Sequence, residues 1–389
     1  MKYPLICDTW NDTELASIQK VVRSNRFSMF EEVSTFESEF ASFFNSKYAV
    51  CVNSGSSANM IAIAAMFFYS ELKRGDEIIV PSVGWSTTYA PLFYLGLKPV
   101  FVDIDFNTLN IDTNKIEEKI NEKTKAILTV NLLGCPSNFD MLNSLAKKYD
   151  LMLLEDNCES MGAMHDNKFC GTYGIGGTFS FFYSHHITTI EGGMILTDDF
   201  EFYNICISLR SHGWLRGVDE KSKIYDDSYS DDFRKMFWFV LPGFNVRPTE
   251  FTGAIGKDQL KKFPQFLKQR KSNFKYFSEK ISKIEGIRTQ EFSEGNSSFS
   301  FALYSEVDAD SKEKFLQLKR LIKETDIEFR PIASGNITRH PMMKHMHTDQ
   351  VKQVISDHVD TYGFMVGNHP VCIKDRIDYL IDKIKTLYK

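Results

Sequence analysis

The chain has 389 residues, of which 43% are hydrophobic and 25% are charged, and its formal net charge is −5. This length favours a large domain accompanied by a smaller one, and the composition is that of an ordinary globular protein. The lack of a basic surplus argues against a nucleic-acid-binding protein, because phosphates would not be neutralised. The 33 phenylalanines predict that aromatic packing dominates the interior or an interface.

The cysteines and the start of the chain indicate the cellular compartment in which the protein is expected. The seven cysteines are an odd number without a C-x-x-C pair, which argues against a disulfide framework or a structural zinc site and favours a reducing cytosol. The chain begins without the apolar segment typical of a signal peptide. Its longest apolar run, residues 60–69, is far shorter than the roughly 20 residues that span a bilayer. We therefore expect a cytoplasmic protein with no membrane partner.

The first candidate site is the run N-S-G-S-S-A-N at residues 53–59. It lies between a strand-like segment at 48–52 and an apolar helix predicted over 59–71. Small residues at such a turn let backbone N–H groups approach an anion, and a helix N-terminus favours negative charge. A simple helix cap by Ser or Asn explains the run equally well from the residues alone.

The second candidate is Trp85, which follows the strand-like residues 77–81. An aromatic side chain at the end of a strand can stack on a flat cofactor. It can also simply fill the core, which is the commoner case.

Further strands are predicted over residues 100–104, 126–132, 151–154 and 194–197, with a helix over 140–148. This alternation predicts an α/β protein with a largely parallel sheet, buried on both faces. The run E-D-N-C-E at 155–159 directly follows one of these strands. Carboxylates at that edge of a parallel sheet lie where α/β proteins bind ligands, although one of them could cap the next helix instead.

The segment 178–193 contains the adjacent pair His185 and His186. A metal site is disfavoured here, because neighbours on an extended strand point to opposite faces and no further ligand stands at a suitable spacing. The glycines at 174–177 do not match G-x-G-x-x-G, so a nicotinamide site is not expected.

After residue 243 the pattern changes to Lys-rich helical sequence around 257–284, followed by short strands and helices. We place a boundary between 242 and 248. It separates a large cofactor-binding α/β domain, residues 1–245, from a small α+β domain, residues 246–389.

Taken in order, these motifs resemble the DegT/DnrJ/EryC1/StrS family of nucleotide-sugar aminotransferases, which use pyridoxal phosphate (PLP). The resemblance covers nearly the whole chain and is carried by residues 36–59, 76–90, 154–163, 179–193 and 243–256. It implies the type I, aspartate aminotransferase-like fold of PLP enzymes.

The resemblance assigns roles to individual residues. It implies phosphate contacts from Gly55, Ser56 and Ser180, and stacking of Trp85 on the pyridine ring. Two carboxylates would also serve the ring, at its nitrogen and near its hydroxyl, and an amide would reach the partner's cofactor in a homodimer. These three residues are Asp156, Glu159 and Asn245, respectively.

One position departs from the aminotransferases of this family. They carry the cofactor-binding lysine six residues before E-G-G, where this chain has His185, and no lysine occurs between Lys168 and Lys221. Imidazole forms no stable Schiff base, so PLP or its amine form, pyridoxamine phosphate (PMP), should be held non-covalently.

With histidine at this position, the chain resembles the 3-dehydratase branch of the family. That resemblance implies a GDP-linked 4-keto-6-deoxy sugar as substrate and L-glutamate as amino donor. The sugar could be a hexose or a 6-deoxy-heptose. His185 would act as the catalytic acid–base, a task that the ordinary imidazole pKa of about 6.5 suits. A dehydratase branch with an iron–sulfur cluster is disfavoured, because the cysteines are scattered.

Two other interpretations remain open: an aminotransferase with a rearranged lysine, and a cofactor-binding protein without catalysis. A local departure is Phe30, which stands where most relatives have glycine. A positive φ at that position would strain a phenylalanine, so a shifted loop is expected there.

Overall fold

The computed structural model describes residues 1–226, 228, 231–292, 295–346, 348 and 352–388. Its main element is a seven-stranded sheet in the order β1-β9-β8-β5-β4-β2-β3. Strands β8, β5, β4, β2 and β3 run parallel, whereas β9 is antiparallel to both β8 and β1. In chain order the strands are β1 (Tyr48–Val52), β2 (Glu77–Pro81), β3 (Lys98–Val102), β4 (Thr124–Val130), β5 (Met152–Asp156), β8 (Gly176–Ser180) and β9 (Gly193–Thr197).

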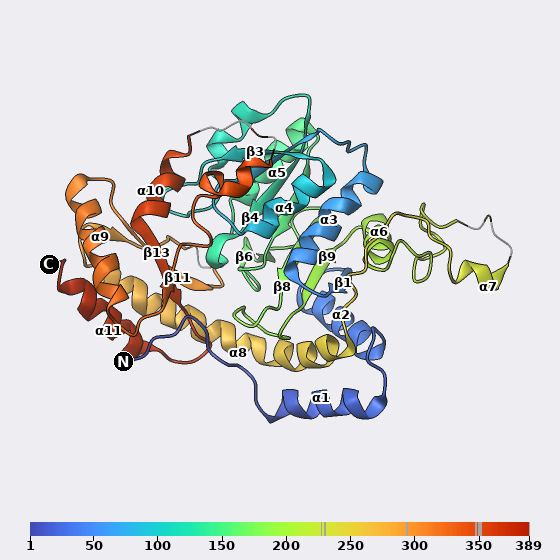
Figure 1. Ribbon diagram of the computed structural model, residues 1–389, viewed down its shortest axis with the longest axis horizontal. Coiled ribbons are helices and arrows are strands. Elements are labelled where there is room, and N and C mark those ends of the chain that lie inside the picture. The colour runs from blue at the N-terminus through green and yellow to red at the C-terminus, as the bar shows by residue number, and fades with distance from the viewer. Residues whose placement is uncertain (227, 229–230, 293–294, 347, 349–351, 389) are drawn as a thin grey trace.

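Helices cover both faces of this sheet (Figure 1). The apolar helix after β1 is buried along most of its length, as its lack of a polar face requires. On the opposite face, rings of Phe36, Phe40 and Phe179 meet within one cluster, and the centroids of Phe36 and Phe40 are 5.8 Å apart. The predicted aromatic interior is thereby confirmed. The helices of this part are α1 (Asp12–Ser24), α2 (Glu31–Phe43), α3 (Gly55–Tyr69), α4 (Ser86–Leu95), α5 (Phe139–Tyr149) and α6 (Phe200–Arg210).

A second sheet of four antiparallel strands has the order β10-β11-β13-β12. Its apolar cluster includes Tyr3, whose hydroxyl donates to the carbonyl oxygen of Gly367 at 2.7 Å. The N-terminus therefore packs on this sheet. The elements here are β10 (Ile287–Arg288), β11 (Ser300–Ser305), α9 (Ala309–Lys323), β12 (Phe329–Arg330), α10 (Val354–Tyr362), β13 (Gly363–Gly367) and α11 (Lys374–Lys385).

One long helix, α8 (Glu250–Ile281), runs beneath both sheets (Figure 1). It packs against α2 and α1 and, farther along, against α11. At the start of α8, the Glu250 carboxylate accepts hydrogen bonds from the backbone N–H groups of Phe30 and Glu32. This contact caps the N-terminus of α2. The predicted boundary falls just before α8, and the division into two domains stays a prediction.

Phe30 is held by its backbone hydrogen bond to Glu250. Its φ is −150°, so the backbone at this position needs no glycine and is not strained. The loop shift expected from the sequence stays a prediction. The ring is exposed and lies under the guanidinium of Arg26, 4.3 Å from the ring centroid.

Between α6 and α8 the chain leaves the body as an arm that carries α7 (Asp232–Lys235) (Figure 1). The two ends of the arm meet at its base, where Trp214 pairs with Phe239. Beside that pair, a Cβ on Gly213 would overlap the carbonyl oxygen of Leu241, and Gly213 has a φ of +84°. Only glycine fits this crossing. Exposed apolar side chains on the arm are Phe233, Met236, Phe237 and Phe239.

The remaining elements are short. The hairpin β6 (Met164–His165) and β7 (Lys168–Phe169) turns at Asp166 and Asn167, both with positive φ. Turns of 3₁₀ type occur at η1 (Thr113–Lys115), η2 (Glu117–Lys119), η3 (Leu132–Gly134), η4 (Ile337–Arg339) and η5 (Pro341–Lys344). Among the described residues, no helix combines the length and the apolar character needed to cross a membrane.

Candidate active site

A cavity of about 440 Å³ opens where β1, β2, β5 and β8 end. Ligands bind at this edge in α/β proteins, because loops from several strands converge there. The cavity is lined by Ser54, Gly55, Ser56, Asn59, Trp85, Thr87, Thr88, Asp156, Cys158, Glu159, Ser180, Phe182, Ser184, His185, Glu191 and Arg330. All but one of the site residues predicted from the sequence are among them.

The predicted anion site lies at the start of α3. Ser54 caps the helix, accepting the N–H of Ser57 at 3.1 Å. A Cβ on Gly55 would come within 2.5 Å of the Cβ of Ser180, so the close approach of these two segments requires glycine. The Ser56 hydroxyl points toward Thr87 and donates to its Oγ1 at 2.9 Å. The two interpretations of residues 53–59, an anion site and a helix cap, are compatible, because the turn is both capped and open to the cavity.

Asp156 is held in place by three hydrogen bonds. Its Oδ2 accepts from the Thr88 hydroxyl at 2.7 Å and from the Asn59 amide at 2.9 Å, and its Oδ1 accepts from the Cys158 N–H at 3.1 Å. The Thr178 hydroxyl in turn donates to Asn59 Oδ1 at 2.6 Å. This network fixes the direction of a carboxylate that is only 4% exposed.

Two further carboxylates of the 155–159 run have different surroundings. Glu155 is fully buried and accepts three backbone N–H groups from the loop at 171–174, so it holds that loop instead of facing the cavity. Glu159 lines the cavity, and burial raises its pKa to about 6, opposed by the positive charge of Arg330 and by the Leu133 N–H. Glu155 is therefore a structural residue, although it holds a loop and does not cap the next helix as the alternative from the sequence had it.

Trp85 stands at the N-terminus of α4 with half of its surface exposed. Its indole lines the cavity instead of filling the core, which leaves a flat apolar face available to a ring-shaped ligand.

His185 lies in a turn, not on the expected strand. Its backbone N–H donates to the Phe182 carbonyl at 2.9 Å, and its ring packs against Phe299 at 5.3 Å between centroids. The ring nitrogen Nδ1 is buried without a hydrogen-bond partner. Burial first, and then the charges of Arg330 and Arg270, lower its pKa to about 3. The ordinary value near 6.5 expected from the sequence is therefore wrong for this environment.

His186 faces away from the cavity. Its Nε2 lies 3.2 Å from the carbonyl oxygen of Ser297, and the side chain is 1% exposed. The two imidazoles separate as predicted, although a turn separates them and not the alternation of a strand.

Asn245 is the predicted site residue that does not line the cavity. It is exposed at the base of the arm, where it pairs with Ser211 and its Oδ1 accepts from Arg247 Nε at 3.0 Å. This placement leaves its role toward a partner subunit as a prediction.

Several cavity residues escaped the sequence analysis. Asn59 and Thr88 orient Asp156 by hydrogen bonds. Both lie in the first turns of helices, α3 and α4, that follow the predicted anion site and Trp85, so their positions next to these motifs were the available signal. Arg330 comes from β12 in the second sheet, and no local motif marks it. Its guanidinium is the one cationic group among the described residues that line the cavity.

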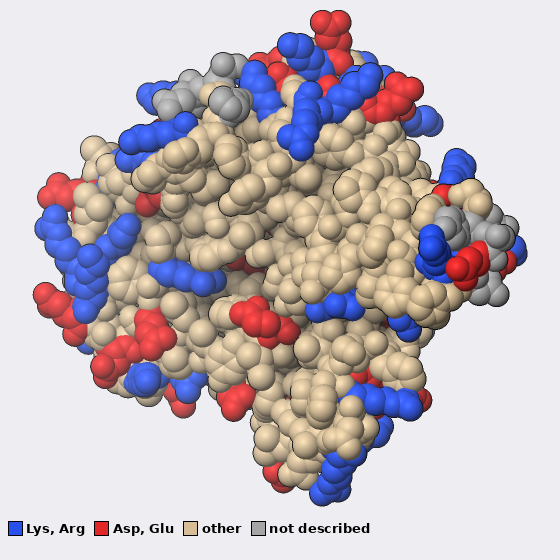
Figure 2. Space-filling model, turned by 45° about the vertical axis from the view of Figure 1, so that its right-hand side comes forward, with Lys and Arg blue, Asp and Glu red and all other residues tan. Residues whose placement is uncertain are grey.

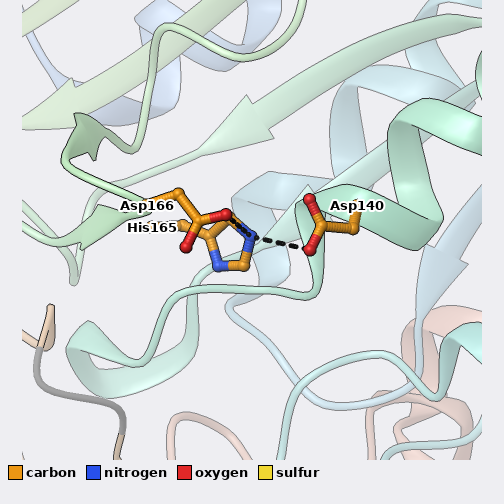
Figure 3. A group of neighbouring side chains, drawn as sticks. All are labelled: Asp140, His165 and Asp166. Atoms are coloured by element: carbon orange, nitrogen blue, oxygen red, sulfur yellow. Dashed lines mark ion pairs between the residues drawn. The ribbon is translucent and has the colours of Figure 1, made fainter.

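A group with metal-ligand chemistry lies elsewhere. Figure 3 shows His165 between Asp140 and Asp166, with Nε2 at 3.5 Å and 3.8 Å from the two carboxylates. Both aspartates are mostly exposed, and such groups are common on surfaces without an ion. Neither His185 nor His186 belongs to it.

The cavity suits PLP. A helix N-terminus with small residues can accept the phosphate, a fixed carboxylate can face the ring nitrogen, and an exposed indole can cover the ring. No lysine is present among the described residues that line the cavity. The donor set therefore fits a non-covalently held cofactor.

Comparison with known proteins agrees with this site. Residues 8–385 match the model of the DegT/DnrJ/EryC1/StrS aminotransferase family. The chain is 47% identical over 389 residues, 99% of its length and 100% of the relative's, to GDP-4-keto-6-deoxy-D-mannose 3-dehydratase from Escherichia coli O55:H7. It is 46% identical over 389 residues to the enzyme of that name from Yersinia pseudotuberculosis, covering 99% of this chain and 98% of the relative.

A solved structure of the E. coli enzyme with bound hydrated PLP matches with a TM-score of 0.94 and 47% identity, over 99% of each chain. Another, with a trapped PLP-glutamate geminal diamine, matches equally well over 98% of this chain and 100% of that one. The type I PLP fold predicted from the sequence is thereby confirmed. The chain belongs to the DegT/DnrJ/EryC1/StrS aminotransferase family.

Proposed function

We propose that the protein is a PLP-dependent hydro-lyase that removes the C3 hydroxyl of a GDP-linked 4-keto-6-deoxy sugar. The product is the 4-keto-3,6-dideoxy sugar, as needed for colitose-type sugars of O-antigen or capsular polysaccharides. The observation that carries the proposal is His185 in the cofactor cavity at the position of the family's lysine. Full-length similarity to enzymes named for this reaction supports the class.

The cofactor is held by the residues that the cavity presents. We assign the phosphate to Gly55, Ser56 and Ser180, and the face of the ring to Trp85. Asp156 would face the ring nitrogen, oriented by its three hydrogen bonds. Glu159, whose pKa lies near 6, would stand near the ring hydroxyl. When bound, the cofactor supplies an electron sink and passes between aldehyde and amine forms as L-glutamate donates its amino group.

His185 carries the proton transfers in this proposal. Its lowered pKa keeps the imidazole neutral at rest, so its unprotonated nitrogen can accept a proton from carbon, as a weaker base than a free imidazole. Once protonated, it is a strong acid in the same environment, and it can deliver that proton to the departing C3 hydroxyl. A lysine at this position would instead return the proton at C4 and release an amino sugar.

The deciding experiment measures ammonia. Incubation with L-glutamate and GDP-4-keto-6-deoxymannose should release ammonia and 2-oxoglutarate together with a product lighter than the substrate by one oxygen atom. An amino sugar without ammonia would show an aminotransferase, and no turnover would show a scaffold. A panel that adds a GDP-linked 6-deoxy-heptose distinguishes the two sugars left open.

We also propose a homodimer with shared active sites, in the cytoplasm. Asn245 is exposed and does not line the large cavity of its own chain. A broad area in the upper part of the face in Figure 2 carries no charged side chain, whereas acidic and basic side chains lie near the centre of the face and at its rim. All seven cysteines are free, as suits a reducing compartment. Sedimentation should give about twice the mass of 44.8 kDa; a fully active monomer would contradict the shared site.

A further inference from the structure

His185 lacks the contact that usually orients a catalytic histidine. Such a ring is commonly fixed by a hydrogen bond at one nitrogen while the other nitrogen reacts. Among the described residues, however, the buried Nδ1 of His185 has no hydrogen-bond partner. The backbone N–H of His185 donates to Phe182 within the same turn, which does not connect that turn to the rest of the molecule. Other parts of the fold must therefore set the direction of the imidazole.

Arg270, in the C-terminal half of α8, reaches this turn from outside the large cavity. It is 4% exposed and lines a separate chamber of about 50 Å³ behind His185. Its guanidinium donates to the carbonyl oxygen of Phe299 at 2.9 Å and to that of His185 at 3.5 Å. The Phe299 ring packs against both imidazoles, with its centroid 5.3 Å from that of His185 and 5.5 Å from that of His186. One guanidinium thus contacts the backbone of the turn and anchors the ring that supports its side chains.

Arg270 is itself held by the residue that follows β13. Its guanidinium donates to the carbonyl oxygen of Asn368, and the Asn368 amide donates back to the carbonyl oxygen of Arg270 at 3.0 Å. Within the described part of the chain, Arg270 takes part in no ion pair, and its Nε is buried without a partner. Burying a charge without a counter-ion is costly. A neutral donor would link these carbonyl groups at a lower cost, so the charge itself calls for an explanation.

The charge of Arg270 acts on the imidazole. Burial lowers the pKa of His185 most, and the positive charges of Arg330 and Arg270 lower it further. The guanidinium of Arg270 therefore helps to keep the ring neutral. The other titratable groups around His185 are His186 in the same turn, Cys7 and His369 on the side of the small chamber, and Asp156, Glu159 and Glu191 on the side of the large cavity.

We infer that Arg270 is the positioning residue of His185, because it holds both the turn and the supporting Phe299 ring in place of the missing hydrogen bond at Nδ1. The inference rests on the proposed function, in which His185 moves protons between carbon and oxygen. Arg270 does not line the large cavity. Its loss should therefore lower kcat for dehydration and leave KM for the sugar near the value of the parent.

The first test measures dehydration by the PLP-loaded protein. Arg270→Met should lower kcat at least about 10-fold, a part of the roughly 10²–10⁴-fold contribution of a positioned acid–base group. Arg270→Lys keeps the charge but not the forked pair of contacts, so it should lose less. The matched control is Arg210→Met, which removes an equally buried arginine, 4% exposed, whose partners are Glu37 and Cys51. A kcat like that of the parent in folded Arg270→Met, or an equal loss in Arg210→Met, overturns the inference.

The second test observes His185 by NMR and requires no turnover. With isotope-labelled histidine, the ring signal that disappears in His185→Asn belongs to residue 185. In Arg270→Met its chemical shift at neutral pH should change, because the Phe299 ring loses its anchor, and protonation should begin at a higher pH, by on the order of one pH unit. Arg210→Met should change neither property. An unchanged signal in Arg270→Met overturns the inference.

A third variant and a negative activity result are also decisive. If Arg270→Met does not fold, Arg270→Lys takes its place: the chemical shift of His185 should change while the pH of protonation stays near that of the parent, and an unchanged shift overturns the inference. If the parent releases no ammonia from glutamate and the 4-keto sugar, the proposed function is refuted. A changed His185 signal in the arginine variants would then still support the positioning of His185 by Arg270.

Discussion

The hydroxyl of Thr88 donates to Asp156 Oδ2 at 2.7 Å, which ties the first turn of α4 to the end of β5. With the amide of Asn59 on the same oxygen and the Cys158 N–H on the other, both carboxylate oxygens already serve as acceptors. An asparagine in this place must turn its NH2 group toward at least one donor. The site therefore depends on a carboxylate for its geometry as well as for its charge.

Asp156→Asn should lower kcat on the order of 10²-fold, because a charged partner for the ring nitrogen is lost. Circular dichroism should show an intact fold. Asp140→Asn removes an exposed carboxylate outside the cavity and should leave kcat unchanged. If Asp156→Asn turns over like the parent, Asp156 does not serve the ring nitrogen.

His185→Lys should attach the cofactor covalently. It restores the family's amine in a site whose burial favours the neutral, nucleophilic form of lysine. The cofactor should then survive gel filtration, and borohydride should fix it to the peptide that contains residue 185. A variant that releases its cofactor as freely as the parent would place residue 185 out of reach of the aldehyde.

His185→Asn should lose dehydration by about 100-fold or more, the contribution of a positioned acid–base group, and should give no borohydride adduct. The matched control is His186→Asn, which changes a buried neighbour bonded to Ser297 and not to the cavity. It should retain most activity and lose some thermal stability, because the smaller side chain leaves a void. Comparable activity of His185→Asn and the parent would direct attention to Ser184 instead.

The depressed pKa of His185 also predicts a pH effect on stability. The group has a pKa of about 3 when folded and an ordinary 6.5 when unfolded, so its contribution is complete above 6.5 and is lost as pH falls toward 3. Between pH 7.5 and 5, the parent should lose up to about 2 kcal/mol more of unfolding free energy than His185→Asn. Urea titrations at the two pH values measure this difference. Parallel losses in both proteins would mean that His185 titrates normally.

Much of the fold could be predicted because its strands are continuous apolar runs. Residues 48–52 and 77–81 were placed within the bounds of β1 and β2 as observed. The segment 178–193 was taken as extended, but the start of β8 was missed, because Gly176 and Gly177 carry no strand signal. Close packing requires glycine there, since a Cβ on Gly177 would overlap the backbone of Gly171.

The candidate site was predictable where it depends on local motifs and not where it depends on tertiary contacts. Six of the seven proposed cofactor contacts line one cavity, since the ends of neighbouring strands meet at one edge. Arg330 and the depressed pKa of His185 arise from the second sheet and from α8, which approach the site only after folding. No spacing in the sequence carries that information.

The narrow base of the arm holds the two ends of this segment together. Val240 and Leu215 are bonded across the neck to Gly213 and Trp238, and these contacts hold the two chain ends together whatever lies beyond them. Beyond the neck, the Asp219 N–H donates to Asn204 Oδ1 at 2.8 Å and the Ser222 hydroxyl donates to Glu201 Oε2 at 2.9 Å, which ties this first part of the arm to α6. Only changes farther out, around α7, should therefore leave α6 and the cavity in place, as in a loop whose ends are already closed. The part of the arm around α7 is accordingly a suitable point for grafting a tag or a foreign segment.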